Sequence, residues 1–345
     1  MIRVLLAEDS LTQRQLLVEI LNADPEICVV GEAKNGAEGV SLARTLRPDV
    51  IVMDVHMPVM DGLAATKEIM VEVPTPIVLV SSSSSSLGVE LALNAMRAGA
   101  LLVVEKPDKP AAPDFHVRRE QLVRMAKAMS QVKVVRHTAQ QPSQAAPPPT
   151  LAVGRTPIRL VAIAASTGGP AVLQRILGDL PRDFAVPVLV VQHIAAGFVQ
   201  GLADWLNGSS LHPVKVAEHG EPLRPRVVYL APDDRHLGVK APGLIELSAA
   251  PTVNGFRPSG THLFESTARL YGPALAAVIL TGMGRDGVEG LKAVRAAGGT
   301  ILAQDEASSV VFGMPGEAIS AGLVDGVLGA VQIGARLAEL VGEGS

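Results

Sequence analysis

The stretch that most constrains the fold is LVAIAASTGGP, residues 160–170, where an apolar run stops at Ser166. An unbroken apolar run is typical of an interior parallel strand, and Pro170 with the apolar spacing after it indicates a helix. We therefore expect Ser166 on a strand-to-helix turn at the ligand-binding edge of a parallel sheet, in front of unpaired helix N–H groups. This setting suits a nucleophile. It also suits a glycine turn that binds phosphate, with Ser166 as a helix cap.

Length and composition limit the remaining possibilities. A chain of 345 residues predicts two domains of ordinary size. Its net charge of −4, without a basic block, disfavours a DNA-binding output. The single cysteine, Cys28, excludes an intrachain disulfide or a zinc site built from several cysteines, and fits a reducing compartment. No apolar run approaches the roughly 18 residues of a membrane span, so we expect a cytoplasmic protein without membrane insertion.

Residues 1–125 alternate short apolar runs with helical patterns. The runs are residues 4–7, 29–30, 50–53, 77–80 and 101–104. This rhythm predicts an α/β domain built of five βα units around a parallel sheet.

Polar residues end four of these five runs and would meet at one edge of that sheet. They are Glu8 and Asp9, Asp54, Ser81 and Lys106. Three carboxylates at one edge repel one another unless a hard cation lies among them, and oxygen ligands are what Mg²⁺ prefers. The sequence therefore predicts a Mg²⁺ site, at which one acid could accept a phosphoryl group.

These positions, with DVHMPVMDG after the third strand and the Lys106-Pro107 pair, resemble the receiver domain of two-component response regulators. The resemblance implies a flavodoxin-like fold, Asp54 as phosphoacceptor and a histidine kinase as phosphodonor. Val103 stands where the family usually has an aromatic switch residue. The implied ligands of Mg²⁺ are Asp9, Asp54, the backbone carbonyl of His56 and, through water, Glu8, and the implied contacts of the phosphoryl oxygens are Ser81 and Lys106.

Residues 126–156 lose the apolar periodicity and become rich in Gln, Ala and Pro. This composition predicts an extended, semi-rigid linker. Strand patterns resume at residues 160–165, 186–192, 227–230, 277–281 and 300–304. Residues 157–345 are therefore predicted to form a second, doubly wound and mostly parallel α/β domain.

Polar residues also follow strand patterns of this second domain. Ser166, His193 and Asp286 each follow one, so a serine, a base and a carboxylate could converge for nucleophilic catalysis. His193 and Asp286 could instead cap the helices that come after them. The chain lacks both the G-x-S-x-G elbow and the G-x-x-x-x-G-K-[ST] phosphate loop, which weakens the commoner explanations of Ser166.

The motifs ASTGGP, QHI, VYLAPDDRH, FRPSGTHLF, TGMGRDG and AQDEASSVVFGMPGEAI resemble the catalytic domain of the chemotaxis protein-glutamate methylesterases, the CheB family. The resemblance implies Ser166 as nucleophile, His193 as general base and then acid, and Asp286 as the residue that orients the imidazole. It also implies that the backbone N–H of Met283 holds the oxyanion, beside glycines 282, 284, 287 and 290. Gly260-Thr261 replace the family's more common Val-Asp, a change we expect to affect substrate choice.

The implied activity is phosphorylation-activated hydrolysis of glutamate methyl esters on chemoreceptors, with deamidation of receptor glutamines as a variant. The hydrolase chemistry needs no cofactor, and no nucleic acid is expected as a partner. A pure scaffold would predict a broken triad, and a transcriptional regulator would predict a basic helix-turn-helix. The sequence shows neither feature.

Overall fold

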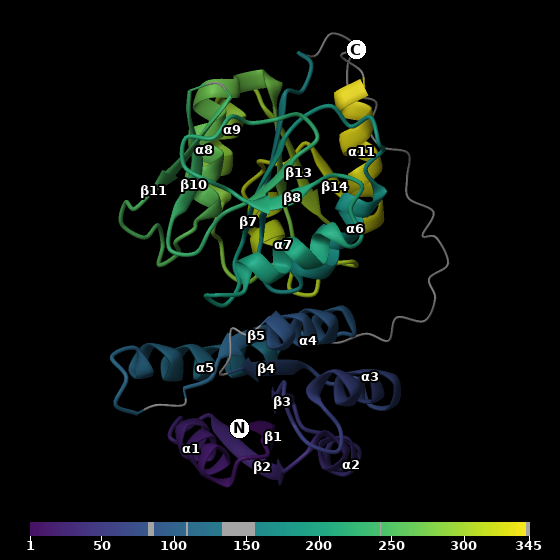
Figure 1. The fold of residues 1–345 in the computed structure, drawn as a ribbon, viewed down its shortest axis with the longest axis vertical. Coiled ribbons are helices and arrows are strands. Elements are labelled where there is room, and N and C mark those ends of the chain that lie inside the picture. The colour runs from purple at the N-terminus through teal and green to yellow at the C-terminus, as the bar shows by residue number, and fades with distance from the viewer. Residues whose placement is uncertain (82–85, 108–109, 133–155, 242, 343–345) are drawn as a thin grey trace. The chain divides into compact units, whose positions relative to one another are not determined.

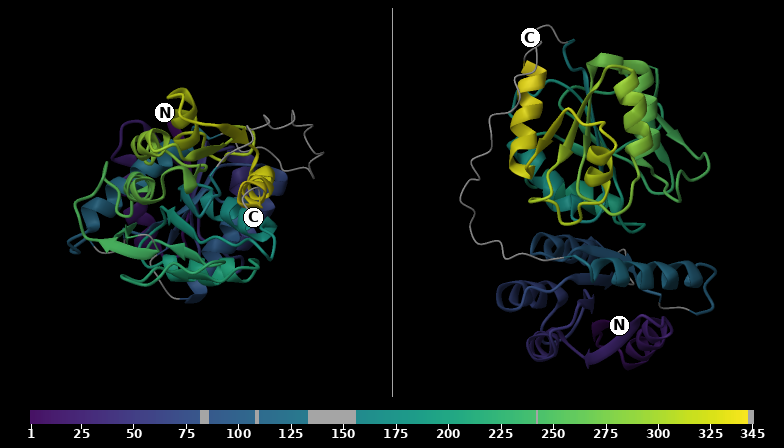
Figure 2. Two further views of the ribbon diagram at one scale, coloured as in Figure 1. Left: turned by 90° about the horizontal axis from the view of Figure 1, so that it is seen from above. Right: turned by 180° about the vertical axis from the view of Figure 1, so that it is seen from behind.

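The computed structural model describes residues 1–81, 86–107, 110–132, 156–241 and 243–342. The chain divides into two compact units, Met1–Pro142 and Ser143–Ser345. Each unit contains its own parallel sheet with flanking helices (Figures 1 and 2), which confirms the predicted fold class. The division falls within the predicted linker, and the exact domain limits stay predictions.

The first unit is built on a five-stranded sheet with the order β2-β1-β3-β4-β5, and all neighbouring strands are parallel. Each predicted run forms one of its strands. The strands are β1 (Ile2–Ala7), β2 (Ile27–Ala33), β3 (Val50–Asp54), β4 (Ile77–Ser81) and β5 (Leu102–Glu105). β3 and β4 are buried along their whole length, as expected of strands covered on both faces.

Five helices connect and follow these strands. They are α1 (Leu11–Asn22), α2 (Gly36–Leu46), α3 (Gly62–Glu72), α4 (Ser86–Arg97) and α5 (Phe115–Met129). The side chains of Asn35 and Asp61 cap α2 and α3 by accepting hydrogen bonds from backbone N–H groups, which fixes where each helix begins. Helix α5 continues past residue 125, the predicted end of this domain.

The second unit contains a seven-stranded parallel sheet with the order β14-β13-β12-β6-β7-β9-β8. Its strands are β6 (Leu160–Ala165), β7 (Val188–Gln192), β8 (Val214–Val216), β9 (Val228–Leu230), β12 (Leu275–Ile279), β13 (Thr300–Gln304) and β14 (Gly326–Leu328). The chain builds outward from β6 in one direction and then returns to continue from β12 in the other. The end of β6 is therefore a topological switch point, where open α/β sheets bind ligands.

Helices cover both faces of this sheet. On one face α6 (Gly169–Asp179) packs against α11 (Ala330–Gly342), and on the other α8 (Gly260–Tyr271) packs against α9 (Val288–Ala296) (Figures 1 and 2). The remaining helices are α7 (Val199–Asn207), α10 (Met314–Ser320) and the 3₁₀ turn Gly272–Ala274. A buried cluster that includes Leu263, Phe264 and Leu291 joins α8 and α9 to the sheet.

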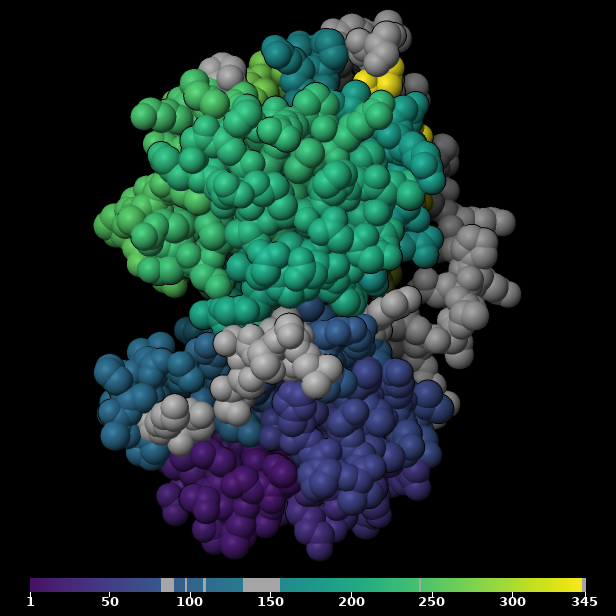
Figure 3. Space-filling model, in the orientation of Figure 1, coloured from purple at the N-terminus to yellow at the C-terminus, as the bar shows by residue number. Residues whose placement is uncertain are grey.

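The antiparallel hairpin of β10 (His236–Ala241) and β11 (Leu244–Ser248) lies outside the main sheet and was not predicted. It projects at the edge of the second unit, in the green part of Figure 3. In the parts of the chain that the structure describes, no helix combines the length and the apolar character needed to cross a membrane.

Candidate functional site: a serine–histidine–aspartate group and a separate acidic cluster

Ser166 lies where the sequence predicts it, directly after β6 and before α6. Its backbone N–H donates to the carbonyl of Thr281 at 3.0 Å, and its own carbonyl accepts from Gly169 N–H at 2.8 Å. The N-cap of α6 is Gly168, with a φ of 78°, so Ser166 does not cap this helix. The side chain is half-buried and thus remains accessible at the carboxyl end of the central strand.

His193 follows β7, the strand beside β6, and its backbone N–H donates to Ala165 carbonyl at 2.9 Å. Its Nε2 lies 3.0 Å from Oδ2 of Asp286. Both ring nitrogens are buried, and neither forms a well-directed hydrogen bond among the described residues. Helix α7 has Phe198 as its N-cap, which excludes His193 as a cap of that helix.

Asp286 lies in the loop between β12 and α9, and only 1% of it is exposed. Its Oδ1 accepts from Ser259 Oγ at 2.7 Å and from Thr261 N–H at 3.2 Å, and its Oδ2 accepts from Gly260 N–H at 2.6 Å. These donors belong to the N-terminus of α8, whose backbone dipole favours an anion. Because Gly287 is the N-cap of α9, Asp286 serves the start of α8 and does not cap α9.

These contacts determine the charge of Asp286. Burial alone would raise the pKa of the carboxyl, but the imidazole of His193 and the donors from Ser259 and Gly260 favour the ionised form more strongly. The result is a pKa lowered from 3.8 to about 2. A buried carboxylate that is ionised at neutral pH and lies beside one imidazole nitrogen can fix the tautomer of that ring and stabilise its protonated form.

The backbone around Met283 lies against Ser166. A Cβ added to Gly282 would come within 2.7 Å of Ser166 Cβ, so only glycine permits this approach. Met283 is half-buried and follows directly, which suits an oxyanion donor. Of the other predicted glycines, Gly290 instead packs against Thr261 of α8.

Gly260 and Thr261 are both buried beneath Asp286. Their backbone N–H groups donate to the carboxylate, and Thr261 Oγ1 accepts from Gly287 N–H at 2.9 Å. The departure from the family pattern therefore lies in the support of the carboxylate. Its effect on substrate choice stays a prediction.

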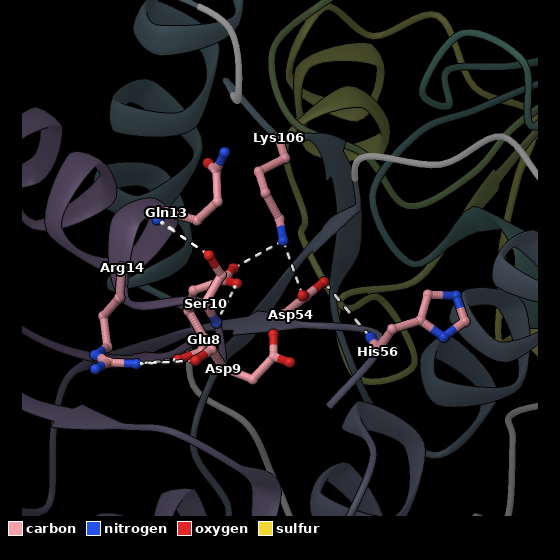
Figure 4. Close-up of polar contacts among 8 residues, drawn as sticks. All are labelled: Glu8, Asp9, Ser10, Gln13, Arg14, Asp54, His56 and Lys106. Carbon is pink, nitrogen blue, oxygen red and sulfur yellow. Dashed lines mark hydrogen bonds and ion pairs between the residues drawn. The ribbon is translucent and has the colours of Figure 1, made fainter. Parts of the chain in front are cut away.

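The polar residues of the first unit also converge, at the carboxyl edge of its sheet (Figure 4). Ligand oxygens of Glu8, Asp9 and Asp54 all lie within 4.8 Å of one another. The buried Lys106 Nζ donates to Glu8 Oε2 at 2.7 Å and to Asp54 Oδ2 at 2.8 Å. The backbone N–H of His56 lies 3.5 Å from Asp54 Oδ1.

The charges of this acidic cluster are strongly coupled. Burial raises the pKa of Glu8, with the Asp54 charge adding to the effect and Lys106 opposing it. Burial would lower the pKa of Lys106, but the charges of Asp54 and Glu8 outweigh this and raise it. The carboxylate oxygens of Glu8, Asp9 and Asp54 are suitable ligands for Mg²⁺, and the Lys106 ammonium beside them balances part of their charge.

Two further residues singled out in the sequence lie in β4 and β5 of the same sheet. Ser81 is the last residue of β4, is 3% exposed and pairs with Glu105 of β5. Val103 is buried in β5 opposite Leu79. The serines at 82–85 lie outside the described residues.

Sequence reasoning assigned no role to two residues that hold the hydrolase site together. Gln192 Nε2 donates to the carbonyls of Ser166 and His193, both at 2.8 Å, and so joins the two loops. Ser259 is both the N-cap of α8 and a donor to Asp286. A polar residue ending an apolar strand and a serine preceding a helical pattern are the signals that could have identified them.

Comparison with known proteins gives a consistent identity for both units. The CheB methylesterase family matches residues 161–337, and the response regulator receiver domain family matches residues 4–112. The crystal structure of the Thermotoga maritima CheB methylesterase catalytic domain aligns with a TM-score of 0.52 and 43% identity. It covers 54% of this chain, and the chain covers all of that domain.

Relatives match over nearly the full length. The protein-glutamate methylesterase/protein-glutamine glutaminase 4 of Myxococcus xanthus is 55% identical over 97% of this chain and 96% of its own. A counterpart numbered 3, from Anaeromyxobacter dehalogenans, is 53% identical over 98% of both chains. With a receiver domain, a CheB catalytic domain and full-length relatives of this kind, the chain belongs to the CheB family of protein-glutamate methylesterases/protein-glutamine glutaminases.

Proposed function

We propose that this protein hydrolyses glutamate methyl esters on chemoreceptors, deamidates receptor glutamines at the same site, and is activated by phosphorylation of Asp54. The observation that carries the proposal is the buried Asp286 carboxylate, held by three donors from 259–261 and lying 3.0 Å from His193. The activities for which the relatives are named support the choice of substrate.

In the proposed reaction Ser166 Oγ attacks the ester carbonyl while His193 accepts the hydroxyl proton. The carbonyl oxygen becomes an oxyanion, which the backbone N–H of Met283 stabilises. The imidazolium, stabilised by Asp286, then protonates the leaving methoxide, and methanol departs. Water attacks the acyl-enzyme with His193 again as base, which releases the glutamate carboxylate and restores Ser166. A glutamine follows the same steps with ammonia as the leaving group.

The acidic cluster of the receiver is proposed as the regulatory site. Asp9, Asp54 and the carbonyl of His56 would hold Mg²⁺, with Glu8 acting through water. When bound, the ion supplies positive charge to the transferring phosphoryl group. Lys106 and Ser81 would contact the phosphoryl oxygens on Asp54, and a histidine kinase would be the donor. Phosphorylation replaces the single negative charge of the Asp54 carboxylate with the nearly two charges of an acyl phosphate, a change that can bias a two-state element.

The test is methanol release from membranes that carry methylated receptors, measured with and without a small-molecule phosphodonor. Ser166→Ala should reduce turnover to a residual rate about 10³–10⁴ times that of the uncatalysed hydrolysis in water. Ser209→Ala, which changes an exposed serine, should leave turnover unchanged. Asp54→Asn should keep basal activity and lose the stimulation. Near wild-type release by folded Ser166→Ala protein would refute the nucleophile, and stimulation of Asp54→Asn would refute the phosphorylation site.

A further inference from the structure

We propose that Phe256 is a positioning residue for His193. In this role, which rests on the proposed function, Phe256 fixes the plane of the imidazole so that Nδ1 faces Ser166. The rings of Phe256 and His193 are stacked with centroids 4.2 Å apart and planes 6° from parallel. Such near-parallel contact between two half-buried rings is a defined geometry of aromatic pairs.

The stack supplies a constraint that Asp286 alone does not. Asp286 meets the imidazole at Nε2, at 3.0 Å, and contact at one nitrogen leaves the ring able to rotate about that contact. Neither ring nitrogen forms a well-directed hydrogen bond among the described residues, so no directed polar contact prevents this rotation. A flat aromatic ring against one face does prevent it, because tilting the imidazole would separate the two planes.

Phe256 is itself held in a tight turn. Val253 and Phe256 exchange both backbone hydrogen bonds, each at 3.0 Å. Asn254 and Gly255 between them have φ values of 52° and 84°. Two consecutive positive φ values in Asn-Gly are the signature of a two-residue hairpin turn. The ring is therefore carried by a backbone with few alternative conformations.

The loop after β9 fastens this turn and the histidine loop to the same place. The guanidinium of Arg257, next to Phe256, donates to Asp234 Oδ1 at 2.8 and 2.5 Å and to the carbonyl of Ala250 at 3.0 Å. The neighbouring Asp233 accepts from Gly197 N–H, in the loop that begins at His193, at 2.8 Å. Two adjacent aspartates thus hold the loops that bring the stacked rings together.

The kinetic test uses the full chain and methanol release from methylated receptor membranes. Phe256→Leu keeps an apolar side chain but removes the flat ring, and should lower kcat by about 10–100-fold with KM within about twofold, as expected for a misaligned base. Phe256→Tyr should retain kcat within about threefold. Asp234→Asn should lower kcat less than Phe256→Leu. A rise in KM alone would make Phe256 a substrate contact, and equal losses in the Leu and Tyr variants would overturn the role of the ring.

An NMR measurement tests the stack without relying on activity. In protein carrying ¹³C-labelled histidine, the ring protons of His193, assigned with His193→Gln, should be shifted upfield by Phe256. They should move downfield in Phe256→Leu and stay in place in Phe256→Tyr. Unchanged His193 signals in Phe256→Leu would overturn the proposal. A wild-type chain that releases no methanol would instead refute the proposed function, and the spectra would still decide whether Phe256 fixes the imidazole.

Discussion

The two sites place buried carboxylates in opposite surroundings. In the receiver, Asp54 and Glu8 share one ammonium, that of Lys106, and Asp9 adds a third acid nearby. In the hydrolase unit, Asp286 is surrounded by neutral donors from Ser259 and the backbone of α8, with one imidazole beside it. The receiver site therefore balances charges against one another, whereas the hydrolase site holds a single charge in fixed dipoles.

This difference matches what each site is proposed to do. A cluster of acids around one lysine can accept a cation and a phosphoryl group. The cation relieves the repulsion among the carboxylates, and the lysine balances the negative charge of the phosphoryl group. A carboxylate held by rigid dipoles keeps its charge and position while the reaction moves a proton next to it. Substitutions that remove a charge or a hydrogen-bonding group should therefore affect the two sites differently.

The largest effect is expected when the fixed charge is removed. Asp286→Asn preserves shape but loses the anion beside Nε2, so the imidazole can take the wrong tautomer. We expect kcat to fall on the order of 10⁴-fold with little change in KM, as for the same change in the catalytic triad of a serine protease. Methanol release across receptor concentrations measures both constants.

Asp183→Asn is the matched control, since it makes the same chemical change at an exposed residue. It should leave both constants unchanged. Loss of thermal stability in Asp286→Asn with turnover retained would contradict the catalytic role and leave Asp286 as a support for α8 only.

The second effect concerns the cation that the receiver cluster should accept. Mg²⁺ at about 100 times its Kd should raise the free energy of unfolding of the receiver by about 2.7 kcal/mol. Asp54→Asn removes one proposed ligand and should weaken binding, so the same Mg²⁺ concentration should stabilise this variant less. Denaturant unfolding of the full chain, with and without Mg²⁺, measures the difference.

Asp49→Asn, which changes a receiver acid outside the cluster, should respond to Mg²⁺ like the wild type. An equal response in the wild type and Asp54→Asn would show that Asp54 is not a ligand.

The sequence predicts which side chains form the two sites better than it predicts the short strands and the backbone donors around them, for physical reasons. Residues that follow apolar strand runs could be placed on one sheet edge, and the structure brings Glu8, Asp9 and Asp54 together there. The short strands β8 and β14 are only partly buried and so lack a continuous apolar run, and they were missed, whereas the equally short but fully buried β9 was predicted. The cradle of Asp286 consists largely of backbone N–H groups from α8, which carry no residue-specific signal.

The third effect is a pH dependence that the hydrolase site should show. The pKa of Asp286 falls from 3.8 to about 2 on folding, so the folded state binds fewer protons there than the unfolded state. Its contribution, about 2 kcal/mol, is present above about pH 4 and is lost as pH falls through about 2. Denaturant unfolding between pH 5 and pH 2 should therefore show a steeper loss in the wild type than in Asp286→Asn. Equal slopes would mean that the donors around Asp286 do not lower its pKa.

The smallest effect tests whether the neutral support of Asp286 depends on one hydroxyl. Thr261 Oγ1 accepts from the buried Gly287 N–H at 2.9 Å and so joins the start of α8 to the loop that carries Asp286. Thr261→Val keeps the volume and leaves that N–H unpaired, which should lower the free energy of unfolding of the hydrolase unit by about 1 kcal/mol. Thr261→Ser keeps the acceptor and should lose about half of this or less. Denaturant unfolding at neutral pH compares the two variants. If Val were tolerated as well as Ser, the hydroxyl would contribute nothing, and the backbone donors alone would hold the carboxylate in its place.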